Sequence, residues 1–92
     1  MAAHHIVAGG ALAAAPARAV LQRFGIGINE AANGVFLPRA ANGTAAAVHA
    51  GGHSRAYYDA VNAALAQATT RDEVLEALEA LRQDLLNGNL GL

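Results

Sequence analysis

The 92-residue sequence is long enough for one domain with a modest hydrophobic core. It has no cysteine, which excludes a disulfide framework and a thiolate metal site, and no apolar run approaches the roughly 18 residues of a membrane span. The net charge is −1, with four arginines against two carboxylates in residues 1–60 and two against five in residues 61–92, whereas a nucleic-acid binder usually has a stronger basic excess.

The first part of the chain predicts a strand followed by a helix. Residues 3–7 (AHHIV) are short and end in β-branched side chains, and Gly9 with the next glycine stops them, so we expect a strand that enters a loop. Residues 11–24 are rich in Ala and Leu with apolar residues at helical spacing. Pro16 is tolerated only in a first turn, so the helix is expected to begin near it.

The middle of the chain predicts a turn, a second strand and a loop. Asn33 and Gly34 form a pair that suits positive φ, and the run Val-Phe-Leu at 35–37 has strand propensity. Residues 39–48 contain another Asn-Gly pair and are expected to form a loop.

The last part of the chain predicts two helices. Residues 54–68 carry apolar side chains at helical spacing, and Ser54 is a candidate N-cap. Residues Thr70 to Glu73 form a capping box, and a leucine-rich apolar stripe then runs through a C-terminal amphipathic helix over about 71–87. We expect this stripe to pack on the core and the acidic outer face to repel nucleic acid.

All four histidines fall into two clusters, His4 with His5 and His49 with His53. The H-x-x-x-H spacing lets the second pair turn to one point, either on one helical face or at the junction of a loop and a helix. Imidazole nitrogens are good ligands for zinc and nickel-like ions. Adjacent residues of a strand face opposite ways, so at most one of the first pair is expected to join them, which leaves the other as a base.

Such a set suits hydrolysis of a phosphodiester, in which a metal neutralises the phosphate and a neighbouring imidazole activates water. Other readings remain open at this point. The first pair could be a tag remnant or a solvated chain end, and the second could be incidental in a glycine-rich loop. Two imidazoles alone also hold a metal loosely, and a third ligand is normally needed.

Three segments in order, AHHIV, NEAANGVFLP and HAGGHSRAYYDAV, resemble the AHH family of nucleases in the HNH/endonuclease VII superfamily. The likeness covers residues 3–65, within a single domain expected over 1–92. It implies a mostly helical α+β fold with a small ββα-metal (His-Me finger) core, an extra helix between the strands and a C-terminal amphipathic helix. Members of the family commonly occur as C-terminal toxin domains of bacterial polymorphic toxins.

Carried over residue by residue, the resemblance implies a metal-dependent endonuclease. His4 would be a metal ligand on the first strand and His5 the general base. Asn33 would match the middle asparagine of the superfamily, which orients the base. His49 and His53 would complete the metal site from the helix of the ββα unit, although the two glycines between them weaken a helix there.

Several further expectations follow. Arg39 and Arg55 flank the site in sequence and could bind the scissile phosphate, although solvated surface arginines are the plainer reading. An all-imidazole site favours one zinc or nickel-like ion over magnesium. The resemblance implies nucleic acid as a partner, DNA rather than RNA, and a cognate immunity protein. No membrane partner is expected.

The alternative function is a small non-enzymatic helical module whose histidines are incidental or hold a structural metal. The near-neutral charge and the Ala-rich composition favour it. No signal peptide is visible, and only three residues precede the first histidine. The chain is therefore expected to be part of a longer secreted or injected effector that acts in the cytoplasm of a target cell.

Overall fold

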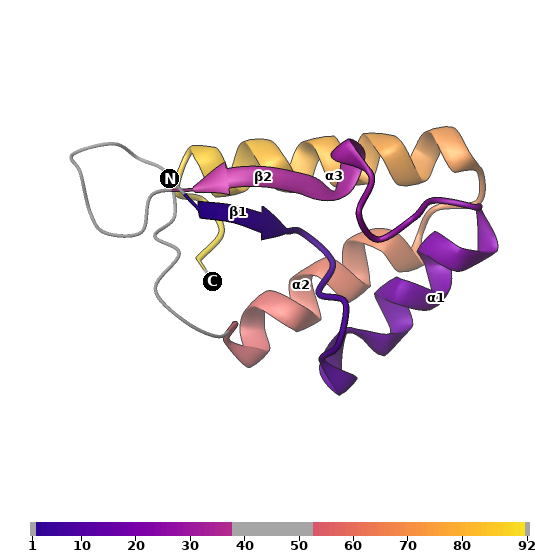
Figure 1. Cartoon of the computed structure of the whole chain (residues 1–92), viewed down its shortest axis with the longest axis horizontal. Coiled ribbons are helices and arrows are strands. Elements are labelled where there is room, and N and C mark those ends of the chain that lie inside the picture. Colours follow the sequence, from indigo (N-terminus) through magenta and orange to yellow (C-terminus); the bar gives the residue numbers. More distant parts are fainter. Residues whose placement is uncertain (1, 38–52, 92) are drawn as a thin grey trace.

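The computed structural model describes residues 2–37 and 53–91 (Figure 1). In chain order its elements are β1 (Ala2–His5), the 3-10 turn η1 (Leu12–Ala14), α1 (Ala15–Arg23), the 3-10 turn η2 (Ala31–Asn33), β2 (Gly34–Leu37), α2 (Arg55–Ala66) and α3 (Arg71–Leu86). These residues form the predicted mostly helical α+β fold, with a helix between the two strands and an amphipathic helix at the C-terminal end.

The two strands form a two-stranded antiparallel sheet in which His4 lies opposite Val35 and His5 opposite Gly34. Because side chains alternate along a strand, one face of the sheet is buried and the other is open to solvent. His4 and Val35 are buried, whereas His5 and Phe36 are exposed. The first strand ends at His5 rather than at residue 7, and the two apolar residues that follow it enter the core.

The turn before the second strand has a different backbone conformation from the one that the sequence predicts. A 3-10 turn ends at Asn33, and Gly34 has extended backbone angles, with φ −115° and ψ 149°, instead of the positive φ that the Asn-Gly pair suggested. Gly34 opens β2 directly, so the connection enters the strand without a left-handed residue.

Helix α1 begins as the proline predicted, with Pro16 in its first turn. Its N-cap residue is an alanine and supplies no side-chain bond. Asn62 of α2 takes that part instead, because its Oδ1 accepts from the N–H of Ala17 at 3.1 Å and its Nδ2 donates to the carbonyl of Ala13 at 2.8 Å. The two helices are thus joined at the start of α1.

Helices α2 and α3 both begin at the predicted caps. The Ser54 hydroxyl accepts from the N–H of Tyr57, and the Thr70 hydroxyl accepts from the N–H of Glu73. Glu73 completes the second cap by accepting from the N–H of Thr69 at 2.6 Å. Helix α3 ends at Leu86, within one residue of the predicted end.

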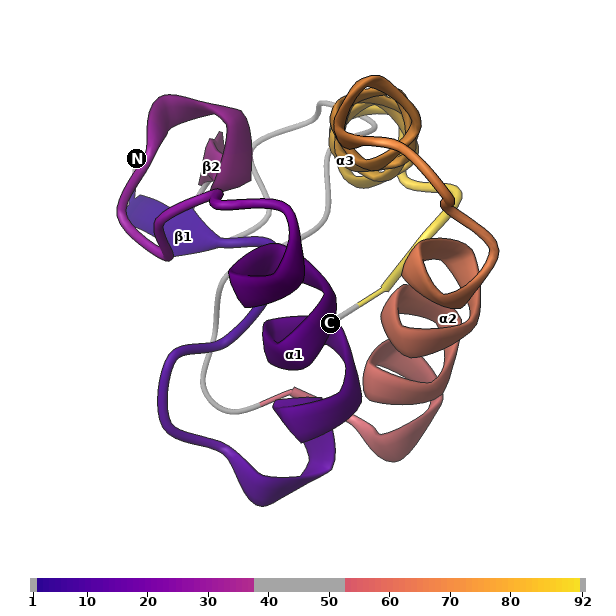
Figure 2. The same cartoon turned by 90° about the vertical axis from the view of Figure 1, so that its right-hand side faces the viewer.

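The core lies between the inner face of the two-stranded sheet and the three helices. Helix α3 runs along β2, and α2 packs between α3 and α1 (Figures 1 and 2). The apolar stripe of α3 is buried as predicted, through Val74, Leu78, Leu81 and Leu85. In the described part of the chain, no helix has both the length and the apolar character that crossing a membrane requires.

Candidate active site

His4 and His53 come together although 48 residues separate them in the chain. Their ring centroids are 4.7 Å apart, and the ring planes are nearly perpendicular, at 80°. His4 lies on the buried face of β1 with 4% of its surface exposed, and His53 is half-buried just before the Ser54 cap of α2. His53 therefore lies at the junction of a loop and a helix, not within the helix that the resemblance implied.

Tyr57 packs against both of these histidines. Its ring stacks on that of His53, with centroids 4.4 Å apart and planes at 22°, and its hydroxyl oxygen lies 3.2 Å from Nε2 of His4. The same hydroxyl donates to the carbonyl of Ile6 at 2.5 Å. Burial, with a smaller contribution from Tyr58, raises the pKa of Tyr57 far above its usual value, so the hydroxyl keeps its proton.

The chemistry of these groups fits a divalent metal ion. Two imidazoles converge, and the Nδ1 atom of His53 is buried beside the ring of His4. Within residues 2–37 and 53–91, no three His, Cys, Asp or Glu side chains are close enough to hold an ion by themselves. The predicted ligand His49 and the predicted phosphate contact Arg39 both lie outside the described residues.

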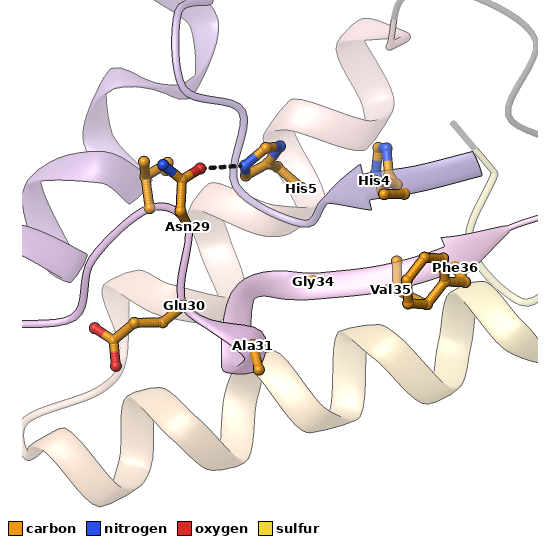
Figure 3. Close-up of a pocket in the computed structure, with 10 residues that line it drawn as sticks. His4, His5, Asn29, Glu30, Ala31, Gly34, Val35 and Phe36 are labelled. Carbon is orange, nitrogen blue, oxygen red and sulfur yellow. Dashed lines mark hydrogen bonds between the residues drawn. The ribbon is translucent and has the colours of Figure 1, made fainter.

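His5 faces the opposite way and contacts a different residue from the one expected. Its Nε2 lies 2.8 Å from Oδ1 of Asn29, as the dashed line in Figure 3 shows. An amide oxygen can only accept, so Nε2 carries the hydrogen and the lone pair of the neutral ring is on Nδ1. Both side chains line a hollow of about 280 Å³ together with residues of β2 such as Phe36.

Asn33, which the resemblance assigned to orienting the base, is completely buried and bonds to the backbone instead. Its Oδ1 accepts from the N–H of Val7 at 2.8 Å, and its Nδ2 donates to the carbonyls of Val7 at 3.1 Å and Ile28 at 2.9 Å. The side-chain amide of Asn33 thus makes, with the backbone of Val7, the two hydrogen bonds that another strand residue would make just beyond the end of β1. The asparagine whose side chain contacts His5 is Asn29, whereas Asn33, the last residue of the turn η2, has its side chain in the core.

Two further arginines have other partners. Arg55 lies near a carboxylate, and Arg82 bonds to the backbone of the strand that pairs with β1. Arg55 is exposed, and its Nε lies 3.9 Å from Oδ2 of Asp59. Together with Tyr58 it borders a hollow different from the one beside His5. Arg82 of α3 was counted in the sequence only as a charge. Its guanidinium donates to the carbonyl of Gly34 at 3.0 Å and to that of Ala32 at 2.7 Å. It therefore holds the start of β2, opposite His5.

The comparison with protein families decides the identity of this arrangement. Residues 1–88 match a nuclease family of the HNH/ENDO VII superfamily that is defined by a conserved AHH motif. The chain belongs to this AHH nuclease family. The motif corresponds to Ala3, His4 and His5. No curated protein and no solved structure gives a significant match to the chain.

The general chemistry of this chain follows from its membership of the AHH nuclease family. The family implies a nuclease that hydrolyses phosphodiester bonds and therefore acts on nucleic acid, and HNH nucleases generally use a divalent metal ion. Membership also argues against the alternative of a non-enzymatic helical module. Two residues that the sequence did not single out for this chemistry are Asn29 and Tyr57. Tyr57 carried one usable signal, because it follows His53 by one helical turn.

Proposed function

We propose that this chain is a metal-dependent endonuclease that cleaves DNA and serves as a bacterial toxin effector domain. The observation that carries the proposal is that the rings of His4 and His53 meet, with centroids 4.7 Å apart, while His5 follows His4 in sequence and lies on the other face of β1. A pair of ligands and a separate base are what metal-assisted hydrolysis needs. The motif and the family supply the reaction class.

In this proposal His4, His53 and His49 hold one zinc or nickel-like ion, which imidazole ligands favour over magnesium. When bound, the ion supplies positive charge that stabilises the charge developing on the phosphate and on the leaving oxygen. Arg39 and Arg55 are proposed to contact neighbouring phosphates of the substrate.

His5 takes the proton of the attacking water on Nδ1, while its Nε2–H stays bonded to Asn29. The water oxygen forms the new bond to phosphorus, the bond to the leaving oxygen breaks, and that oxygen receives a proton from solvent. Asn29 keeps the lone pair of His5 on Nδ1 and stabilises the imidazolium that forms. The exposed carboxylates of α3 favour approach of DNA from the other side of the molecule.

The division between base and ligand is tested with His5→Ala and His53→Ala. Supercoiled plasmid is incubated with each zinc-loaded protein, with and without chelator, and bound metal is measured by mass spectrometry. We expect His5→Ala to lose about 100-fold or more in cleavage while it keeps its metal, because general base catalysis contributes roughly 10²–10⁴-fold. His53→Ala should lose the metal itself.

Gln22→Ala, an exposed change on α1, is the matched control and should cleave like the wild type. Normal cleavage by His5→Ala, or equal metal loss in both histidine variants, would contradict the assigned roles. An RNA substrate in parallel tests the preference for DNA, and faster cleavage of RNA would reverse it.

The toxin role is tested in bacterial cells. Induced expression of the chain in the cytoplasm should arrest growth, because the proposed target is the DNA of the recipient cell. Expression of His5→Ala to the same level should not. A cognate immunity protein should restore growth and bind the purified chain. Growth arrest that persists in His5→Ala cells would separate toxicity from the nuclease.

A further inference from the structure

The hydroxyl of Tyr57 lies between a backbone carbonyl and the ring of His4. It is 2.5 Å from the carbonyl oxygen of Ile6 and 3.2 Å from Nε2 of His4. Both side chains are buried, with 1% of Tyr57 and 4% of His4 exposed. Hydrogen-bond roles in such a place are fixed by the protein because water does not replace them.

The direction of each bond follows from the number of hydrogens. A carbonyl oxygen only accepts, so the single hydrogen of the Tyr57 hydroxyl points to Ile6. The hydroxyl oxygen can then only accept from His4, and Nε2 of His4 must carry a hydrogen. In a neutral imidazole the lone pair is then on Nδ1.

We propose that Tyr57 is a positioning residue that fixes His4 as its Nε2–H tautomer and so makes Nδ1 the nitrogen that binds a divalent metal ion. This inference rests on the proposed function, in which His4 is a ligand. A histidine ligand normally donates its other ring N–H to a fixed acceptor, which orients the ring and raises its basicity. The Tyr57 hydroxyl is such an acceptor, and Ile6 holds it in that role.

The position of Tyr57 in the fold couples the two ligands. The residue belongs to α2, whereas His4 belongs to β1, and its ring face stacks on His53 at 4.4 Å. One side chain thus bonds the first histidine through its hydroxyl and supports the second through its ring. Tyr57→Phe separates these contributions, since it removes the hydroxyl and keeps the ring.

The tautomer is measured without metal and without nucleic acid. Two-bond proton–nitrogen correlation spectra of uniformly ¹⁵N-labelled protein, at a pH where the ring is neutral, show which nitrogen of His4 carries hydrogen. We expect Nε2–H in the wild type and in Tyr58→Phe, a control that removes the same atom from the neighbouring tyrosine. In folded Tyr57→Phe the two tautomers of His4 should mix.

Zinc affinity is measured for the same proteins by competition with a chromophoric chelator. Tyr57→Phe should bind zinc about 10-fold to 100-fold more weakly than the wild type, as the loss of a ligand's hydrogen-bond partner does. Tyr58→Phe should bind like the wild type. A purely structural tyrosine would lower the stability of the variant but leave the tautomer and the zinc affinity of its folded form unchanged.

The outcomes are separable. An Nδ1–H tautomer of His4 in the wild type overturns the inference, whether or not Tyr57→Phe folds, and leaves the nuclease proposal standing. The same holds if wild type and Tyr57→Phe bind zinc equally well. A wild type that binds no zinc but cleaves DNA without metal removes the ligand role of His4, and with it both proposals.

Discussion

Replacing Asn33 by Ala removes the buried amide that pairs with the backbone beyond the end of β1. The change leaves three backbone groups without their partner, which are the N–H and the carbonyl of Val7 and the carbonyl of Ile28. Both bonds to Val7 are buried, and the one to Ile28 is partly buried. Asn33→Ala is therefore a test of what this side chain does.

These hydrogen bonds set the expected loss in the free energy of unfolding. A buried polar group left unpaired costs about 1–3 kcal/mol, so the two groups of Val7 cost about 2–6 kcal/mol. Ile28 adds less because water can reach it. We expect a loss of about 3–5 kcal/mol in the free energy of unfolding, which is a large part of the roughly 5–15 kcal/mol typical of a domain.

Urea unfolding followed by far-ultraviolet circular dichroism measures this loss. Asn29→Ala is the matched control, because Asn29 is exposed and its loss should change stability by less than about 0.5 kcal/mol. The control should nevertheless slow plasmid cleavage, since it frees the ring of His5. A loss below about 1 kcal/mol in Asn33→Ala would mean that the backbone at Val7 finds other partners, and the reasoning would be wrong.

Two further predictions concern α3. Hydrogen bonds from the backbone N–H and then the hydroxyl of Thr69 lower the pKa of Glu73, so its carboxylate stabilises the fold above the ordinary carboxyl pKa and ceases to do so as the pH falls through the lowered value. Glu73→Gln should therefore lower the urea midpoint at neutral pH and approach the wild type in strong acid; a gap independent of pH would contradict this. Arg82→Met should cost about 2 kcal/mol because carbonyls at Ala32 and Gly34 lose a charged donor, and Arg82→Lys should recover less than half of that, since an ammonium cannot span both. Full stability of Arg82→Lys in thermal unfolding would show that the guanidinium shape is unimportant.

The sequence predicted well what depends on local pattern. The caps at Ser54 and Thr70 fix the starts of α2 and α3, and the proline fixes the first turn of α1. The two strands and the placement of a helix between them came from short apolar runs and from the family resemblance. These features follow from neighbouring residues, so the sequence contains the information directly.

The contacts that complete the site depend on distant parts of the chain. Asn29 and Asn33 have the same side chain, but Asn29 lies before the 3-10 turn η2 and contacts His5, whereas Asn33 ends that turn and bonds to Val7. Arg82 bonds to the start of β2 across about 50 residues, for which no sequence spacing is diagnostic. Tyr57 is a core residue, but its hydroxyl also lies beside His4.

The short strands of the two-stranded sheet have a consequence for any truncation of the enzyme. Four-residue strands are too short to be stable alone in water. Here α2 and α3 supply the anchoring side chains, Tyr57 and Arg82. A truncated chain that stops before α3 would keep every histidine and still be inert, because nothing would hold Gly34 and the strand opposite it in place. Catalytic competence in this nuclease thus belongs to the assembled tertiary structure rather than to the motif that names its family.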